Sequence, residues 1–66
     1  MYLIWCYERK KWWKQTKVGY TANILEAGRF TKGDAEAIVR NANIARKEEE
    51  LVPELKAANF QFKNAL

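Results

Sequence analysis

Apolar side chains are concentrated at the start of the chain, where every position from Tyr2 to Tyr7 is aromatic, aliphatic or otherwise apolar. A basic cluster follows, and after it the adjacent pair Trp12-Trp13. Short runs rich in aromatic and β-branched residues are typical of strands, so the pattern predicts a β-hairpin that turns near Arg9-Lys10. Arg-Lys is not a pair that selects one turn type, so the loop length stays open.

Two registers of this hairpin are compatible with the sequence. A loop of about two residues would place Tyr7 opposite Trp12, whereas a loop of about three would place Trp5 opposite Trp13. Aromatic side chains pair across the strands in both registers. Successive side chains of a strand point to opposite faces, so we expect one of the two adjacent indoles to face outward unless another element covers it.

The stretch from Gln15 to Phe30 has no clear periodicity and contains Gly19 and Gly28. It is predicted to be a connection with a short extended or helical piece around Tyr20 to Ala27. Connections of this length are often packed by their own side chains. The candidates for that packing are Val18, Tyr20, Ile24 and Leu25.

A helix is predicted to begin at Thr31, which has the character of an N-cap, with Asp34 three positions further on and Phe30 before it as a hydrophobic staple. The apolar positions that follow have the i, i+3, i+4, i+7 spacing of one helical face. They are Ala35, Ile38, Val39 and Ala42. Asn41 and Asn43 are plausible ends, although the pattern could continue through Ala45 and Arg46.

The last part of the chain predicts a third strand and a short helix. Leu51-Val52-Pro53 suits a strand that adds to the hairpin, and the proline restricts it to an edge position or to the end of the strand. Beyond Pro53, the residues Leu55, Ala58 and Phe62 have helical spacing, while Phe60 and Phe62 also alternate as in a strand; a short helix is the favoured interpretation. The expected fold is therefore α+β, with residues 1–66 as one domain.

Length and cysteine content limit what this domain can be. With 66 residues the chain has room for one small core, and such cores typically supply only about 3–5 kcal/mol of net stability. Cys6 is the single cysteine, so an intramolecular disulfide is impossible and a reducing, cytoplasmic setting is expected. The run from Tyr2 to Tyr7 is too short to span a bilayer and lacks the flanks of a secretory signal.

Charge adds a local feature to this picture. The chain carries a formal net charge of +4, and the segment from Glu8 to Lys17, with five cations and one anion, accounts for all of it. Outside this segment the positive and negative groups balance. The basicity is thus a patch on the predicted hairpin, next to its tryptophans.

Several kinds of catalytic or ligand-binding chemistry lack the residues that they need. The chain has no histidine and no serine, which excludes Ser-His and Cys-His nucleophile pairs, and one cysteine cannot form a structural zinc site. Asp34 is the single aspartate, and the adjacent Glu48, Glu49 and Glu50 are expected to fan apart rather than converge. The three glycines are too widely spaced for a phosphate-binding loop. We therefore expect no enzymatic activity, no cofactor and no metal, and we expect Cys6 to be a buried, inert thiol.

Lysine and arginine interleaved with tryptophan suit three uses, and composition does not separate them. Cations and indoles together bind single-stranded nucleic acid, an outward Trp beside Arg forms hot spots on protein-binding surfaces, and the same residues can simply build a core and a soluble sheet edge. A protein partner is the favoured interpretation. The candidate partner-binding residues are Arg9, Lys10, Lys11, Trp12, Trp13, Lys14, Lys17, Tyr20 and Arg29. For Tyr20 and Arg29 a structural role is the stronger expectation.

A set of short motifs also resembles those of a known group of proteins. The motifs are Trp12-Trp13, Gly19-Tyr20-Thr21, the run from Glu26 to Thr31, Ala35-Glu36-Ala37-Ile38 and Val52-Pro53-Glu54. In order and spacing they are similar to a group of short phage, prophage and bacterial proteins of unassigned function. Members often carry Pro-Asn after the tryptophan pair, where this chain has Gln15-Thr16.

The resemblance covers Tyr2 to about Glu54 and implies a setting rather than a reaction. It suggests a compact accessory protein of a mobile element that binds a host protein, and it transfers no catalytic residues. Two alternatives stand beside this interpretation. One is single-stranded nucleic-acid binding through the basic aromatic hairpin, and the other is a homo-oligomeric structural protein that associates through the hairpin edge or the segment from Phe60 to Leu66.

Overall fold

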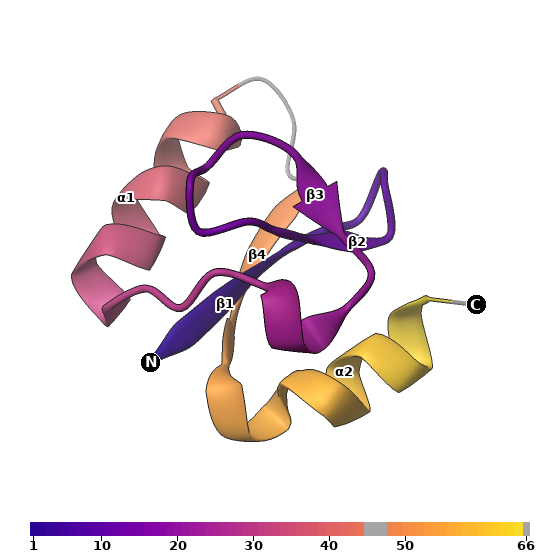
Figure 1. The fold of residues 1–66 in the computed structure, drawn as a ribbon. Coiled ribbons are helices and arrows are strands. Elements are labelled where there is room, and N and C mark those ends of the chain that lie inside the picture. The colour runs from indigo at the N-terminus through magenta and orange to yellow at the C-terminus, as the bar shows by residue number, and fades with distance from the viewer. Residues whose placement is uncertain (45–47, 66) are drawn as a thin grey trace.

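The computed structural model describes residues 1–44 and 48–65. Four segments form one antiparallel sheet: β1 (Tyr2–Cys6), β2 (Lys11–Trp13), β3 (Tyr20–Thr21) and β4 (Glu49–Pro53). Around it lie the helices α1 (Lys32–Ala42) and α2 (Ala57–Asn64) and the short 3-10 turns η1 (Ile24–Glu26) and η2 (Glu54–Lys56) (Figure 1). The predicted α+β class is confirmed.

The sheet has the strand order β3-β2-β1-β4, so β1 lies between β2 and β4. The edge position expected for the strand that ends at Pro53 is correct, and that strand is longer than its three predicted residues. The expectation of three strands is wrong, because Tyr20 and Thr21 pair with Trp13 and Trp12 and add a fourth strand at the other edge. Two residues are too few to produce a periodic pattern, so the sequence predicted only a short extended or helical piece around Tyr20 to Ala27, where the structure has β3 and η1.

Both predicted registers of the hairpin are wrong. The pairing is Trp5 with Trp12 and Cys6 with Lys11, which leaves a loop of residues 7–10. The loop closes because the carbonyl of Cys6 accepts a hydrogen bond of 2.8 Å from the amide of Lys10, which adopts a left-handed conformation with φ of 55°. The longer loop places Trp5 and Trp12 on one face, where their rings meet edge to face at 4.8 Å.

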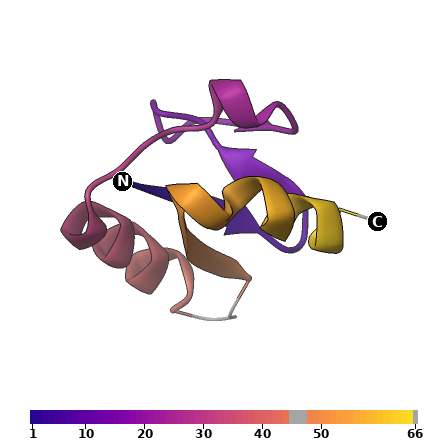
Figure 2. The same ribbon diagram turned by 90° about the horizontal axis from the view of Figure 1, so that it is seen from below.

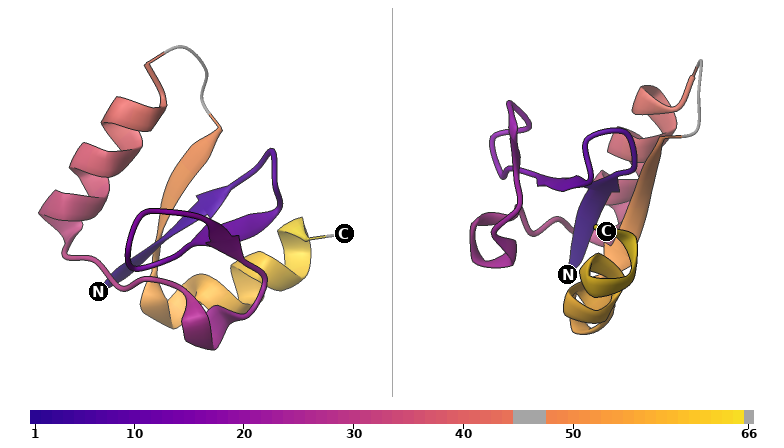
Figure 3. Two further views of the ribbon diagram at one scale, coloured as in Figure 1. Left: turned by 45° about the horizontal axis from the view of Figure 1, so that its top comes forward. Right: turned by 90° about the vertical axis from the view of Figure 1, so that its right-hand side faces the viewer.

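Each face of the sheet is covered by a different helix (Figures 2 and 3). One face buries Leu3, Trp5, Trp12 and Val52 beneath Ala57 and Phe60 of α2 and Ile24 of η1. The other face buries Ile4 with Phe30 and Ala35, and the half-buried side chains of Ile38, Val39 and Leu51 pack around them. The division follows the alternation of strand side chains, because Leu3 and Trp5 point one way and Ile4 points the other.

The helix predicted from Thr31 is confirmed as α1. The Thr31 hydroxyl accepts a hydrogen bond of 3.2 Å from the backbone amide of Asp34. At the other end, Asn43 is the C-cap, and its backbone amide donates a hydrogen bond to the carbonyl of Val39. Ala35 is fully buried, but Ala42 is exposed, so the apolar stripe is one residue shorter than predicted. The suggested continuation through 45 and 46 falls outside the described residues.

The C-terminal helix is confirmed, but the face predicted to be buried is the wrong one. Leu55 is 100% exposed and Phe62 is 73% exposed, and Ala58 is exposed with them. Ala57 and Phe60 face the sheet instead. This segment has apolar residues on two opposite sides. The ring of Phe60 packs on Trp5 and Trp12, with centroid distances of 5.8 and 6.1 Å, and so the side with Phe60 is the one that faces the sheet.

The connection from Gln15 to Phe30 is held by backbone hydrogen bonds and by the buried side chains of Ala27 and Phe30. Val18 and Leu25 are exposed, so their predicted packing is wrong, whereas Tyr20 and Ile24 are half-buried. The Gly28 amide donates to the carbonyl of Trp13 at 2.9 Å, and a Cβ at this glycine would lie 2.8 Å from the backbone of Gln15. Glycine is therefore required at this close approach.

Across the described ranges, no helix has the length and apolar character needed to cross a membrane.

Candidate functional site

The basic hairpin brings together a cation and two aromatic rings that are separated in the sequence. The Arg9 guanidinium lies over the ring of Tyr20, 4.9 Å from its centroid, and the Trp13 ring meets Tyr20 edge to face at 6.1 Å. Trp13 and Tyr20 are direct partners in the pairing of β2 with β3. We call Arg9, Trp13 and Tyr20 the cation-aromatic cluster. All three were candidate residues in the sequence, but their contact was not predicted because it needs β3 to place Tyr20 beside the hairpin.

The two adjacent tryptophans have different surroundings. Trp12 is completely buried, and its indole nitrogen donates a hydrogen bond of 3.0 Å to Gln61 in α2. Trp13 lies on the opposite face and is half-buried against the Ile4 core, and its indole nitrogen donates to Glu49 at 2.8 Å. Trp12 therefore belongs to the core, and Trp13 is the indole with surface left for a partner.

The lysines among the candidate residues lie on β2 and in the turns before and after it. Lys10, Lys11, Lys14 and Lys17 are all exposed. Lys11 lies two residues from Trp13 in β2 and so projects on the same face of the sheet. Lys17 has a left-handed φ of 65° and closes the next turn by donating its amide to the carbonyl of Lys14 at 2.9 Å. The hairpin thus carries exposed cations, of which Lys11 projects on the same face as the half-buried ring of Trp13.

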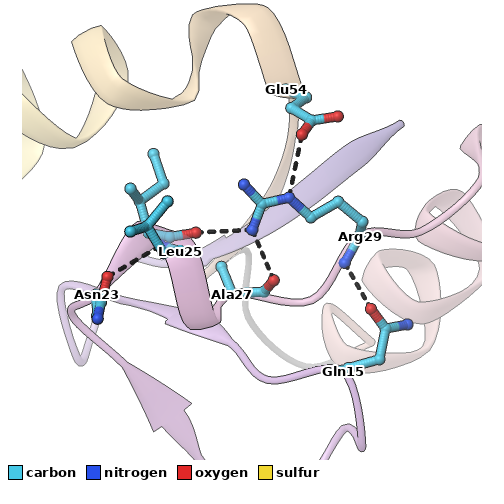
Figure 4. Close-up of polar contacts among 7 residues, drawn as sticks. Gln15, Asn23, Leu25, Ala27, Arg29 and Glu54 are labelled. Carbon is cyan, nitrogen blue, oxygen red and sulfur yellow. Dashed lines mark hydrogen bonds and ion pairs between the residues drawn. The ribbon is translucent and has the colours of Figure 1, made fainter.

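Arg29 lies apart from the cluster and has a structural setting (Figure 4). Its Nη1 donates to the carbonyls of Ile24 and Ala27 at 2.7 and 2.8 Å, and its Nε contacts Glu54 at 3.2 Å. Its own amide donates to the side chain of Gln15 at 2.8 Å. These contacts join η1, the connection and η2, so the arrangement agrees with the structural role expected for this residue.

The adjacent glutamates fan apart across β4, as the sequence predicts. Glu49 points to the Trp13 side, and Glu50 accepts a hydrogen bond of 2.5 Å from the hydroxyl of Tyr7 on the other side. This hydrogen bond, with a smaller contribution from burial, raises the pKa of Tyr7 to about 12. The participation of Glu49 and Glu50 in aromatic contacts was not predicted, because it depends on the pairing of β1 with β4 over more than forty residues.

The part of the chain that the structure describes contains no group of three or more His, Cys, Asp or Glu side chains placed to hold a metal ion. Cys6 is buried, in agreement with the sequence-based expectation, and burial is the main cause that raises the pKa of its thiol. A raised pKa keeps a thiol protonated and unreactive. Neither observation assigns chemistry to the hairpin face.

Comparison of the chain with protein-family models, with curated proteins and with solved structures found no match. The resemblance to short phage and prophage proteins therefore stays a prediction.

Proposed function

We propose that this chain is a small non-enzymatic interaction module that binds an acidic surface of a partner protein through the cation-aromatic cluster. The observation that supports the proposal is the stacking of Arg9 on Tyr20 beside Trp13. The resemblance to phage and prophage proteins suggests that the partner is a host protein. The proposal includes no catalytic step, since the sequence contains neither histidine nor serine.

The composition of the cluster favours a protein partner. Trp, Tyr and Arg are the residue types enriched among the few interface positions that supply most of the binding energy. Such positions bind best when their conformation is set before the partner arrives. Here the indole of Trp13 is held by Glu49, and Tyr20 is held between Arg9 and Trp13. Exposed Lys11, which projects on the same face as Trp13, would add positive charge that steers an acidic partner.

The same geometry makes single-stranded nucleic acid the weaker candidate. Base stacking needs free aromatic faces, but Arg9 already lies over one face of Tyr20. A protein surface can contact the cluster as it stands, whereas a base would first have to displace Arg9.

The proposal is tested by partner capture with surface variants. Purified chain is used to retain proteins from the native host, and retained proteins are identified by cross-linking mass spectrometry and then titrated as pure proteins. Arg9→Glu and Tyr20→Ala are expected to weaken binding about thirtyfold or more, as for hot-spot residues. Lys32→Glu reverses a charge at an exposed position on α1 and serves as the matched control. Equal binding by Arg9→Glu and wild type would contradict the proposal.

A second measurement separates the nucleic-acid alternative. Binding to an oligodeoxythymidine probe is followed by fluorescence anisotropy from low to moderate salt. Binding through phosphates falls steeply with salt concentration, with a slope that follows the number of phosphates contacted. We expect no appreciable binding at physiological salt. Strong, salt-dependent binding that Arg9→Glu abolishes would favour nucleic acid over a protein partner.

A further inference from the structure

The segment formed by η2 and α2 exposes two large apolar side chains. Leu55 of η2 is 100% exposed, and Phe62 of α2 is 73% exposed. The opposite side of α2, with Ala57 and Phe60, is the side that packs on the sheet. The exposure is a consequence of the direction in which the helix docks, since both sides of this segment carry apolar residues.

A hollow lies along one flank of the same helix. Its volume is about 450 Å³, and it is lined by Leu55, Lys56, Asn59, Phe60, Lys63 and Asn64. Ligand pockets generally have volumes of roughly 300–1,000 Å³, so the hollow can accept a large side chain. Phe60 is held from beneath by ring contacts with Trp5, Trp12 and Tyr7, which makes the apolar base of the hollow rigid.

The rim of this hollow has one sign of charge. Lys56 and Lys63 are both exposed, and none of the described residues that line the hollow is acidic. The ion pair shown by the structure joins Arg29 and Glu54, and neither lysine takes part in an ion pair with a described residue. The surface therefore offers an apolar base next to two cations.

We propose that this hollow is a second docking site, which binds an acidic peptide segment of a partner protein. An apolar side chain of the segment would enter between Leu55 and Phe60, and its carboxylates would lie beside Lys56 and Lys63. The site goes beyond the proposed function because α2 covers the opposite face of the sheet from Trp13 and the cation-aromatic cluster. A chain with two such surfaces can hold two partners at once.

Charge favours an acidic segment over a second copy of this chain. A twofold dimer uses the same patch on both copies. Docking hollow to hollow would bring Lys56 and Lys63 of each copy into one interface, and none of the described lining residues is acidic to balance them. An acidic peptide neutralises these lysines and covers Leu55 as well.

The proposal is tested by selecting peptides from an unbiased phage-displayed library on the immobilised chain. Selected peptides are expected to combine Asp or Glu with a Leu, Phe or Trp. Synthetic fluorescein-labelled copies, and copies in which Asn and Gln replace Asp and Glu, are then titrated by anisotropy. The acidic peptides should bind at least about tenfold more tightly than their neutral copies and should shift the amide signals of residues 55–64.

Variants of the chain test the site itself. Leu55→Ser and Lys63→Glu are expected to weaken binding of the selected peptides at least fivefold with an unchanged melting temperature, because both side chains are exposed. Val18→Ser, at another exposed apolar position, and Lys32→Glu are the matched controls. Arg9→Glu should leave peptide binding unchanged, so a failure here is distinguishable from a failure of the proposed function.

Four results would overturn the inference. They are selected peptides without acidic residues, amide shifts confined to residues outside 55–64, a dimer in sedimentation that Leu55→Ser abolishes, and binding of phosphatidylglycerol vesicles in place of peptides. The third would assign the face to a second copy, and the fourth would assign it to a membrane surface.

Discussion

At the scale of single residues, the adjacent Trp12 and Trp13 differ in burial because successive side chains of a strand point to opposite faces. The first is fully buried between Trp5 and α2, and the second is half-buried on the other face, where its indole contacts Glu49. A buried indole stabilises the fold through its area and its satisfied nitrogen, whereas a partly exposed indole can also contact a partner. Substitution of Trp12 would therefore report on folding, and only Trp13 is informative about binding.

Tyr7 and Glu50 make a residue-scale contact with a consequence for pH. The hydrogen bond to Glu50 stabilises the protonated hydroxyl and raises the pKa of Tyr7 from 10.0 to about 12. A group whose pKa is raised by folding contributes stability that is complete below its unfolded pKa and is lost as the pH rises through its folded value. The contribution of Tyr7 is thus present below pH 10 and disappears between about pH 10 and 12.

We expect ultraviolet titration of the wild type to show one tyrosine that ionises near pH 12, with circular dichroism confirming that the fold persists. This transition should be missing in Tyr7→Phe. In Glu50→Gln it should move to lower pH, because the carboxylate acceptor is removed. A transition that stays near pH 12 in Tyr7→Phe would show that another tyrosine is responsible.

At the scale of elements, the turns determine the register of the sheet. Lys10 and Lys17 both have positive φ, at 55° and 65°, in the turns that precede and follow β2. Residues with a side chain pay a steric penalty in this region, and glycine does not. The sequence places lysine at both positions, so each turn stores strain that the pairing of β1, β2 and β3 must offset.

Lys17→Gly is expected to stabilise the fold by about 0.5–1 kcal/mol, because relief of left-handed strain exceeds the extra freedom that glycine gives the unfolded chain. The free energy of unfolding in urea is the measurement. Lys14→Gly, three residues earlier and without a positive φ, is the matched control and should destabilise by a similar amount. Destabilisation by both substitutions would mean that the Lys17 side chain contributes more than its backbone strain costs.

At the scale of the whole molecule, stability depends on contacts that join distant segments. Domains of this size typically have a free energy of unfolding of only about 3–5 kcal/mol. Arg29 joins η1, the connection and η2 through two backbone carbonyls and Glu54. Hydrogen bonds of a charged group to carbonyls contribute about 1.5–3 kcal/mol, whereas an exposed ion pair contributes about 0–1 kcal/mol.

Arg29→Ala should therefore lower the free energy of unfolding by about 1.5–3 kcal/mol, measured by urea denaturation. Glu54→Gln, which removes the ion pair and leaves both carbonyl contacts in place, should cost less than about 1 kcal/mol. Equal losses in the two variants would mean that the ion pair is the dominant contact.

The sequence by itself determined the features that depend on neighbouring residues. The class of fold, the start of α1 at Thr31, the strand before Tyr7 and the divergence of Glu49 from Glu50 all follow from local spacing. The lack of histidine and serine is likewise a property of the chain alone. The sequence is sufficient for these features because each depends on interactions between residues only a few positions apart.

Tertiary structure alone decided the hairpin register, the burial of Trp12 in place of Trp13, and the side of α2 that meets the sheet. The segment after Pro53 offers two apolar faces, and the aromatic contacts of Phe60 select one, which leaves Leu55 and Phe62 outside. The contact of Arg9 with Tyr20 likewise needs β3 in place. Competing local patterns are resolved by packing between residues far apart in the chain, and the surfaces that packing leaves exposed are those on which the proposed binding depends.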